Sequence, residues 1–204
     1  MGQANMKTNT AVEYDFMDFI NFHEFTLDPV MSGNLISLYQ SIFAEHDGWN
    51  EHYSYNDVYQ NLAHELDGNA HLRVCHDAVN EEEVVAFCWA QLQTLSNVCQ
   101  AIKTVQHYEM IGSPDICTPL KNILGDEPVI YLHDLGVKRE LRGKLSLSQL
   151  IYPTLQGLAR QTGIHKVLFW TIANTNVSKL ARRGGFEIVK LHSGMQFYAG
   201  TVEA

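Results

Sequence analysis

The segment 131–150, YLHDLGVKRELRGKLSLSQL, constrains the fold of this 204-residue chain more than any other part of the sequence. An apolar run passes through a basic turn into a stretch with apolar residues at helical spacing, which predicts a strand, a loop and a helix in that order. A helix N-terminus in this setting binds phosphate groups, because its free backbone N–H groups and its dipole both favour an anion. The segment therefore predicts a phosphate site between a strand and a helix.

The loop in this segment supports a phosphate site in two ways. Arg142 and Lys144, on either side of Gly143, add positive charge at the positive end of the helix dipole, and this combination favours a diphosphate. Ser146 and Gln149 have the spacing of a capping box, which would start the helix at Ser146. Without further support, however, a basic turn before a helix is more often a solvated turn.

Hydrophobic periodicity along the chain predicts an α/β fold with a mixed sheet. Alternating and apolar runs predict seven strands, at 12–19, 71–76, 84–95, 127–138, 166–173, 186–191 and 195–199. Helical spacing predicts helices at 31–45, 56–66, 146–162 and 177–183, with a short one at 101–108, and Pro153 is expected to kink the third or delay its start. The main order is β-α-α-β-β-β-α-β-α-β-β. We expect a disordered N-terminus at 1–10 and a single domain over 11–204.

The net charge of −9 disfavours non-specific nucleic-acid binding, but its distribution is more informative than the total. Residues 1–100 carry two basic and fifteen acidic side chains, whereas residues 101–204 carry twelve basic and eight acidic ones. A cationic ligand would be drawn to one half of the chain and an anionic ligand to the other. The alternative is solvated surface charge that is segregated by accident.

Cysteine usage and hydropathy indicate a cytoplasmic protein that is not embedded in a membrane. The four cysteines form no CxxC pair, and Cys75 and Cys88 lie in strand-like runs where buried free thiols are common. No apolar run approaches the ~18 residues that a membrane span needs, and the N-terminus does not resemble a signal peptide. The ten histidines include no HExxH pair, so no metal site is predicted.

Two motifs resemble the GCN5-related N-acetyltransferases (GNATs). The stretch VKRELRGKLSLSQL resembles their acyl-CoA pyrophosphate loop, with Arg142 at its first position but Leu145 and Leu147 where small residues are expected. The stretch NTNVSKLARRGGFEIV resembles their segment from the fifth strand through the fourth helix. Ala181, however, stands where many members have a tyrosine that protonates the leaving thiolate. The resemblance implies a GNAT-like fold, acetyl-CoA as donor, and a set of candidate binding residues: Leu135, Gly136, Val137, Arg142, Gly143, Lys144, Leu145, Ser146, Leu147, Asn174 and Lys179.

Within the fourth predicted strand, LHDLGV resembles serotonin N-acetyltransferase-like members, which place two histidines on one face of the strand. Tyr131 and His133 take those positions, and their spacing of two puts both on one face. His133 would take the proton of an ammonium group, because its unperturbed pKa is about 6.5. Asp134 is expected on the opposite face, ranks below His133 as a base, and could orient a neighbour. A histidine in such a strand is otherwise a hydrogen-bonded core residue.

These observations favour an N-acetyltransferase that moves an acetyl group from acetyl-CoA to a primary amine by direct attack in a ternary complex. A cationic acceptor would be enclosed by acidic and aromatic residues of the first half: Glu45, Asp47, Trp49, Glu51, Tyr53 and Tyr55. The alternative is a catalytically impaired GNAT-fold protein that serves as a binding or regulatory module. A third possibility is a transferase that uses a longer acyl group or a carrier-protein thioester. A homodimer is compatible with the family resemblance.

Overall fold

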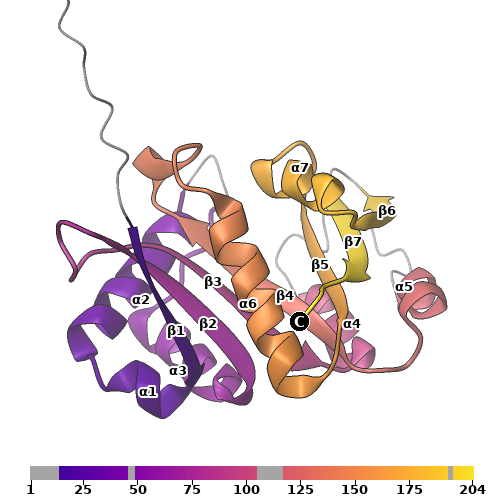
Figure 1. The fold of residues 1–204 in the computed structure, drawn as a ribbon, viewed down its shortest axis with the longest axis horizontal. Helices are drawn as coiled ribbons and strands as arrows, with labels where there is room; N and C mark the ends of the chain where they lie inside the picture. The colour runs from indigo at the N-terminus through magenta and orange to yellow at the C-terminus, as the bar shows by residue number, and fades with distance from the viewer. Residues whose placement is uncertain (1–13, 46–48, 105–116, 193–194) are drawn as a thin grey trace, which may run out of the picture.

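A seven-stranded mixed sheet forms the centre of the protein (Figure 1). The computed structural model describes residues 14–45, 49–104, 117–192 and 195–204. The strand order is β1-β2-β3-β4-β5-β7-β6, and every neighbouring pair is antiparallel except the parallel pair β4–β5. The strands are β1 (Tyr14–Asn21), β2 (Asp67–Asp77), β3 (Val84–Gln93), β4 (Val129–Val137), β5 (Lys166–Ile172), β6 (Glu187–His192) and β7 (Met195–Thr201). The predicted mixed α/β fold is confirmed.

Seven α-helices accompany the sheet within the described residues. They are α1 (Phe22–Thr26), α2 (Pro29–Phe43), α3 (Tyr55–Glu65), α4 (Leu95–Thr104), α5 (Cys117–Leu124), α6 (Leu147–Thr162) and α7 (Asn176–Arg183). The sequence did not predict α1 or α5, which are too short to show a clear helical period. Pro153 lies inside α6, so of the two predicted alternatives a later helix start is excluded. The predicted disordered segment 1–10 lies outside the described residues.

The two faces of the sheet carry different helices (Figure 1). On one face α6 packs over β2, β3 and β4, and side chains such as Cys88 and Ile130 belong to this core. On the opposite face α1, α2 and α3 enclose a second core that includes Leu72 and Trp89. The helices α4 and α5 form a third core with Leu168 and other residues of β4, β5 and β7. None of the described helices is long and apolar enough to cross a bilayer.

Local capping fixes the ends of α2 and α3. The Asp28 side chain accepts a hydrogen bond of 2.9 Å from the backbone N–H of Met31, and Pro29 opens the helix with its preset φ. At the start of α3, Ser54 and Asp57 form a capping box, with bonds of 3.1 and 2.9 Å. The second cap fixes the end of the short segment that joins α2 to α3, part of which lines the site described below.

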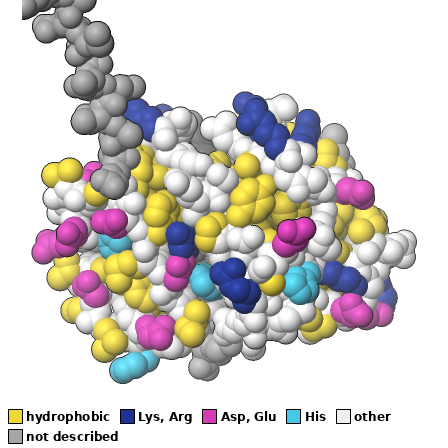
Figure 2. Space-filling view, viewed as in Figure 1, with side chains coloured by type: hydrophobic (Ala, Val, Ile, Leu, Met, Phe, Trp, Pro, Cys, Tyr) yellow, Lys and Arg dark blue, Asp and Glu magenta, His cyan; other side chains and the backbone are white. Residues whose placement is uncertain are grey.

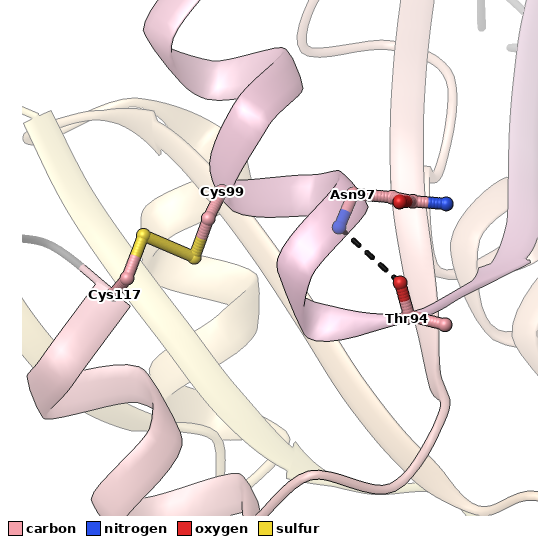
Figure 3. Close-up of a disulfide and its surroundings, with 4 residues drawn as sticks. All are labelled: Thr94, Asn97, Cys99 and Cys117. Carbon is pink, nitrogen blue, oxygen red and sulfur yellow. Dashed lines mark hydrogen bonds between the residues drawn. A yellow bond between two sulfur atoms is a disulfide. The ribbon is translucent and has the colours of Figure 1, made fainter.

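A disulfide joins Cys99 of α4 to Cys117 of α5, eighteen residues further along the chain (Figure 3). The start of α4 is stabilised nearby, where the Thr94 hydroxyl accepts a hydrogen bond of 3.2 Å from the backbone N–H of Asn97. The sequence analysis expected a reducing compartment and no disulfide, so this pairing corrects it; cysteine spacing gave no sign of the pair. The other two cysteines of the chain, Cys75 and Cys88, are free and buried, as predicted.

Candidate functional site

The site lies where the parallel strands β4 and β5 separate. Their pairing is limited to Ile130 with Val167 and Tyr131 with Leu168, although β4 continues to Val137 and β5 to Ile172. Two cavities, of about 720 and 600 Å³, open on this side of the sheet and share Trp49, Leu135 and Val177 in their walls. The end of β4 therefore contributes to two neighbouring cavities.

The first cavity, called the basic cavity below, is formed by the end of α2, the end of β4, the loop before α6, and α7. Its cationic side chains are Arg142, Lys179 and Arg183, and it also contains the start of α6. In Figure 2, groups of lysine and arginine side chains lie over α7 and over the loop before α6. The lining residues are Ile42, Glu45, Trp49, Leu135, Val137, Arg142, Gly143, Leu145, Ser146, Leu147, Ser148, Asn176, Val177, Lys179, Leu180 and Arg183.

Three of the predicted binding residues do not line the basic cavity. A Cβ atom on Gly136 would lie 2.3 Å from the Phe87 ring, so this glycine permits close packing under α2. Lys144 is exposed beside the cavity. Asn174 is exposed, with a φ of 65°, in the turn before α7, and Asn176 lines the cavity in its place. The other predicted binding residues all line this cavity.

The two leucines of the loop belong to the hydrophobic core. Leu145 is buried, and Leu147 packs against the same core beneath α6. The predicted capping box is absent, because the Ser146 hydroxyl hydrogen-bonds to Ser148 at 2.8 Å and makes no cap bond. The backbone N–H of Gln149 instead donates to the carbonyl of Ser146 at 3.1 Å. Helix α6 thus begins at the predicted place, anchored by leucine packing rather than by a side-chain cap.

Arg142 is engaged by a carboxylate from the other half of the chain. Its Nη1 and Nη2 atoms each donate to an oxygen of Glu45 at 2.7 Å, and its Nε donates to the carbonyl of Val137 at 3.1 Å. Glu45 was expected near an amine acceptor, but it lies in the basic cavity. This bidentate pair holds the guanidinium at the mouth of the cavity.

The second cavity, called the aromatic cavity below, contains two carboxylates and many aromatic rings. Its charged or titratable groups include Glu51, His52, His133 and Asp134, and none of the described residues that line it is lysine or arginine. The lining residues are Tyr39, Phe43, Trp49, Glu51, His52, Tyr53, Asn61, Ala101, Tyr131, Leu132, His133, Asp134, Leu135, Phe169, Trp170, Thr171, Ile172, Thr175 and Val177. Such a cavity suits a cation with an apolar body.

His133, which lines this cavity, sits between the carboxylates of Asp134 and Glu65. Its Nδ1 lies 2.9 Å from Oδ2 of Asp134 and its Nε2 lies 3.3 Å from Oε1 of Glu65, while its ring stacks on Trp89 with centroids 5.4 Å apart. Burial lowers the pKa of His133, but the negative charges of Asp134 and Glu65 outweigh it and raise the pKa to about 9. His133 is therefore mostly protonated at neutral pH.

The position of Asp134 differs from the prediction. A bulge interrupts the β3–β4 register, in which Trp89 faces Asp134 but Ala90 faces Leu132. Consecutive side chains no longer alternate strictly there, so Asp134 lies beside His133 rather than on the opposite face. The Tyr39 hydroxyl donates to the same Asp134 oxygen at 2.9 Å.

Tyr131 shares the cavity with His133, and their rings meet edge to face at 5.7 Å. The Tyr131 hydroxyl accepts a hydrogen bond of 2.8 Å from Trp170 Nε1, and burial raises the pKa of the phenol well above its usual value. Tyr131 therefore stays protonated and offers a hydrogen-bond donor rather than a base. Ala181, at the position of the family tyrosine, is buried in the α6 core.

The remaining predictions for this region have mixed outcomes. Trp49, Glu51 and Tyr53 line the aromatic cavity as expected, whereas Tyr55 is half exposed and does not line it. Asp47 lies outside the described residues. The sequence analysis missed Tyr39 and Glu65, which approach Asp134 and His133 from α2 and α3. Both occupy ordinary helical positions, so no local sequence signal marks them.

Comparison with known proteins identifies the fold. No protein-family model matches the sequence, and no curated protein matches it. The structure is similar to that of Arabidopsis thaliana NAA60 in complex with acetyl-CoA, at 16% identity over 94% of this chain and 100% of that chain, with a TM-score of 0.56. It is also similar to Drosophila melanogaster polyamine N-acetyltransferase, which forms N-acetylagmatine, at 14% identity over 92% and 100% of the two chains, with a TM-score of 0.55.

A GNAT-family acetyltransferase from Streptococcus pneumoniae gives a TM-score of 0.57 at 8% identity, over 94% of this chain and 100% of that chain. The three likenesses span nearly the whole of each chain. The predicted GNAT-like fold is therefore confirmed.

Proposed function

We propose that this protein is an N-acetyltransferase that moves an acetyl group from acetyl-CoA to a primary amine by direct attack. The observation that carries the proposal is the pair of adjoining cavities at the separation of β4 and β5, one cationic and one acidic and aromatic. Two cavities of opposite character suit an anionic donor and a cationic acceptor that react where the cavities meet. The fold shared with acetyltransferases supports the same reaction.

The basic cavity would hold the donor. Arg142, Lys179 and Arg183 supply positive charge for the phosphates, and the first turn of α6 supplies backbone N–H groups. Leu135 and Val137 of β4 would lie along the pantetheine arm and lead the thioester to the aromatic cavity. Because Glu45 already occupies the Arg142 guanidinium, donor phosphate would have to share or replace that carboxylate.

The aromatic cavity would hold the acceptor and supply the base. The neutral fraction of His133 accepts a proton from the ammonium group at Nε2, which otherwise lies 3.3 Å from Glu65, and Asp134 holds the imidazole through Nδ1. The free amine attacks the thioester carbonyl carbon, the nitrogen loses its second proton to water as the amide forms, the carbon–sulfur bond breaks, and CoA leaves as a thiolate. With no hydroxyl at Ala181, the thiolate takes its proton from water. A base with a pKa of about 9 is better matched to an alkylamine than an unperturbed histidine is.

Acetyl transfer to a panel of primary amines at pH 9 tests the proposal, with the release of CoA as the measured signal. Wild type should turn over, and His133→Ala should lose about 10²- to 10⁴-fold in kcat. The matched control is His23→Ala on α1, an exposed histidine outside both cavities, which should keep wild-type rates. Unchanged activity in His133→Ala would remove His133 from the mechanism. A folded wild-type protein that neither binds acetyl-CoA in calorimetry nor acetylates any amine would overturn the proposed function.

A further inference from the structure

A buried carboxylate in the aromatic cavity has no role in the mechanism above. Glu51 is only 8% exposed, yet it lines this cavity. Burying a charged side chain is costly, so carboxylates at such positions commonly serve a specific interaction. Glu51 therefore merits a role in acceptor recognition.

The segment that carries Glu51 is tied to α2. The backbone N–H of Glu51 donates to the carbonyl of Phe43 at 2.8 Å, and Gln40 Nε2 donates to the carbonyl of Tyr53 at 2.8 Å. The Tyr53 hydroxyl donates to Oε2 of Glu51 at 2.7 Å. The carboxylate is thus oriented before any ligand arrives, which is the preorganisation that selective binding needs.

Aromatic rings surround this part of the cavity. Trp49 and Trp170 meet edge to face at 5.4 Å, and Phe43 and Tyr53 at 6.0 Å. A carboxylate among aromatic faces attracts an ammonium or guanidinium group through both charge and cation–π interaction.

Glu51 is connected to the reactive centre through two tyrosines. Tyr53 meets the Tyr39 ring at 5.5 Å between centroids, and the Tyr39 hydroxyl donates to Asp134 at 2.9 Å. The cavity therefore has one carboxylate, Asp134, beside His133 and another, Glu51, bonded to Tyr53. An acceptor with two cationic groups would lose one proton at His133 and keep its second positive charge, which the Glu51 carboxylate could bind.

We propose that Glu51 determines acceptor specificity by binding a second cationic group, so that the preferred acceptors are alkylamines with a distal ammonium or guanidinium. This inference rests on the proposed acetyltransferase function and adds the substrate class and the residue that selects it. The distal ammonium or guanidinium group stays protonated through the reaction. It contributes to binding of both the ground state and the transition state.

The test compares kcat/KM for 1,4-diaminobutane, agmatine, n-butylamine and 4-amino-1-butanol at saturating acetyl-CoA. Wild type should prefer the two dications over the matched monoamines, and Glu51→Gln should lower this preference by about tenfold. Its kcat/KM for n-butylamine should fall much less than that for the two dications, because that amine has no distal charge. Glu51→Asp should retain part of the preference, and Glu127→Gln, on an exposed carboxylate that pairs with Lys166, should retain all of it.

The outcomes separate the two claims. Turnover of amines without a preference for dications, or with the same preference in Glu51→Gln, would overturn the inference and leave the proposed function intact. No turnover of any amine by the wild type would overturn both. If Glu51→Gln does not fold, Glu51→Asp and the wild-type comparison of butylamine with diaminobutane still decide the matter. A loss only for diaminobutane, with agmatine unaffected, would identify an ammonium as the group that Glu51 recognises.

Discussion

The basic and aromatic cavities share one stretch of β4, yet they handle charge in opposite ways. In the basic cavity, the Arg142 side chain is 41% exposed, although its partner Glu45 is only 16% exposed. In the aromatic cavity, His133 is enclosed by Asp134 and Glu65, whose side chains are only 15% and 14% exposed. The cations differ more than the carboxylates: a guanidinium that reaches solvent can exchange its partner at little cost, whereas an imidazole held between two carboxylates keeps its proton. Under the proposed function, donor binding would therefore depend on exchange of the Arg142 partner, and catalysis on pH.

The largest expected effect concerns His133 and its partner Asp134. For wild type, kcat should rise by about fiftyfold between pH 7 and 9, because the folded-state pKa of His133 lies above its ordinary value and the neutral base appears only as pH rises through it. Asp134→Asn removes a charge that raises this pKa, so the midpoint should move to lower pH, and loss of positioning should lower the plateau by about tenfold or more. Steady-state kinetics from pH 6 to 10 measure both.

An unchanged midpoint in Asp134→Asn would show that this carboxylate does not set the charge of His133. The KM for acetyl-CoA should stay within about twofold of wild type, since Asp134 does not line the basic cavity. A large change in that KM would mean that the two cavities are not functionally separate.

The next effect concerns the Arg142–Glu45 pair from its cationic side. Arg142→Ala should raise the KM for acetyl-CoA by about tenfold, because the variant loses a guanidinium that can donate two hydrogen bonds to a phosphate group. Its KM for the amine should not change. Initial rates over a matrix of both substrates separate the two constants, and an equal rise in both would contradict the division of roles.

The smallest effect tests the same pair from its acidic side. Glu45→Gln removes the carboxylate that competes for Arg142, so the KM for acetyl-CoA should fall by about threefold. Calorimetric titration with acetyl-CoA measures the affinity directly, and the gain should vanish in the double variant with Arg142→Ala. Weaker binding in Glu45→Gln would show that Glu45 positions the arginine for the donor instead of competing with it.

Local patterns were sufficient to predict much of the scaffold. The seven strands, α6 and the basic loop follow from apolar periodicity and from turn chemistry, which act over a few residues. Tyr131 and His133 were placed in one site by the two-residue period of a strand, and both line the aromatic cavity. The charge difference between the chain halves is retained only in part. The cations of the basic cavity come from the second half and Glu51 from the first, but Glu45 of the first half lies in the basic cavity and Asp134 of the second half in the aromatic one.

Only the tertiary structure decided which of these residues meet. Glu45 reaches Arg142 across 97 residues, Tyr39 reaches Asp134 across 95, and Cys99 pairs with Cys117. A bulge opposite Trp89 brought Asp134 to His133, which no alternating pattern predicts. The sequence by itself determined the elements and the chemistry they carry, since both depend on neighbouring residues. The charge state of the base and the partner of the arginine depend on distant side chains, and folding alone brings those together.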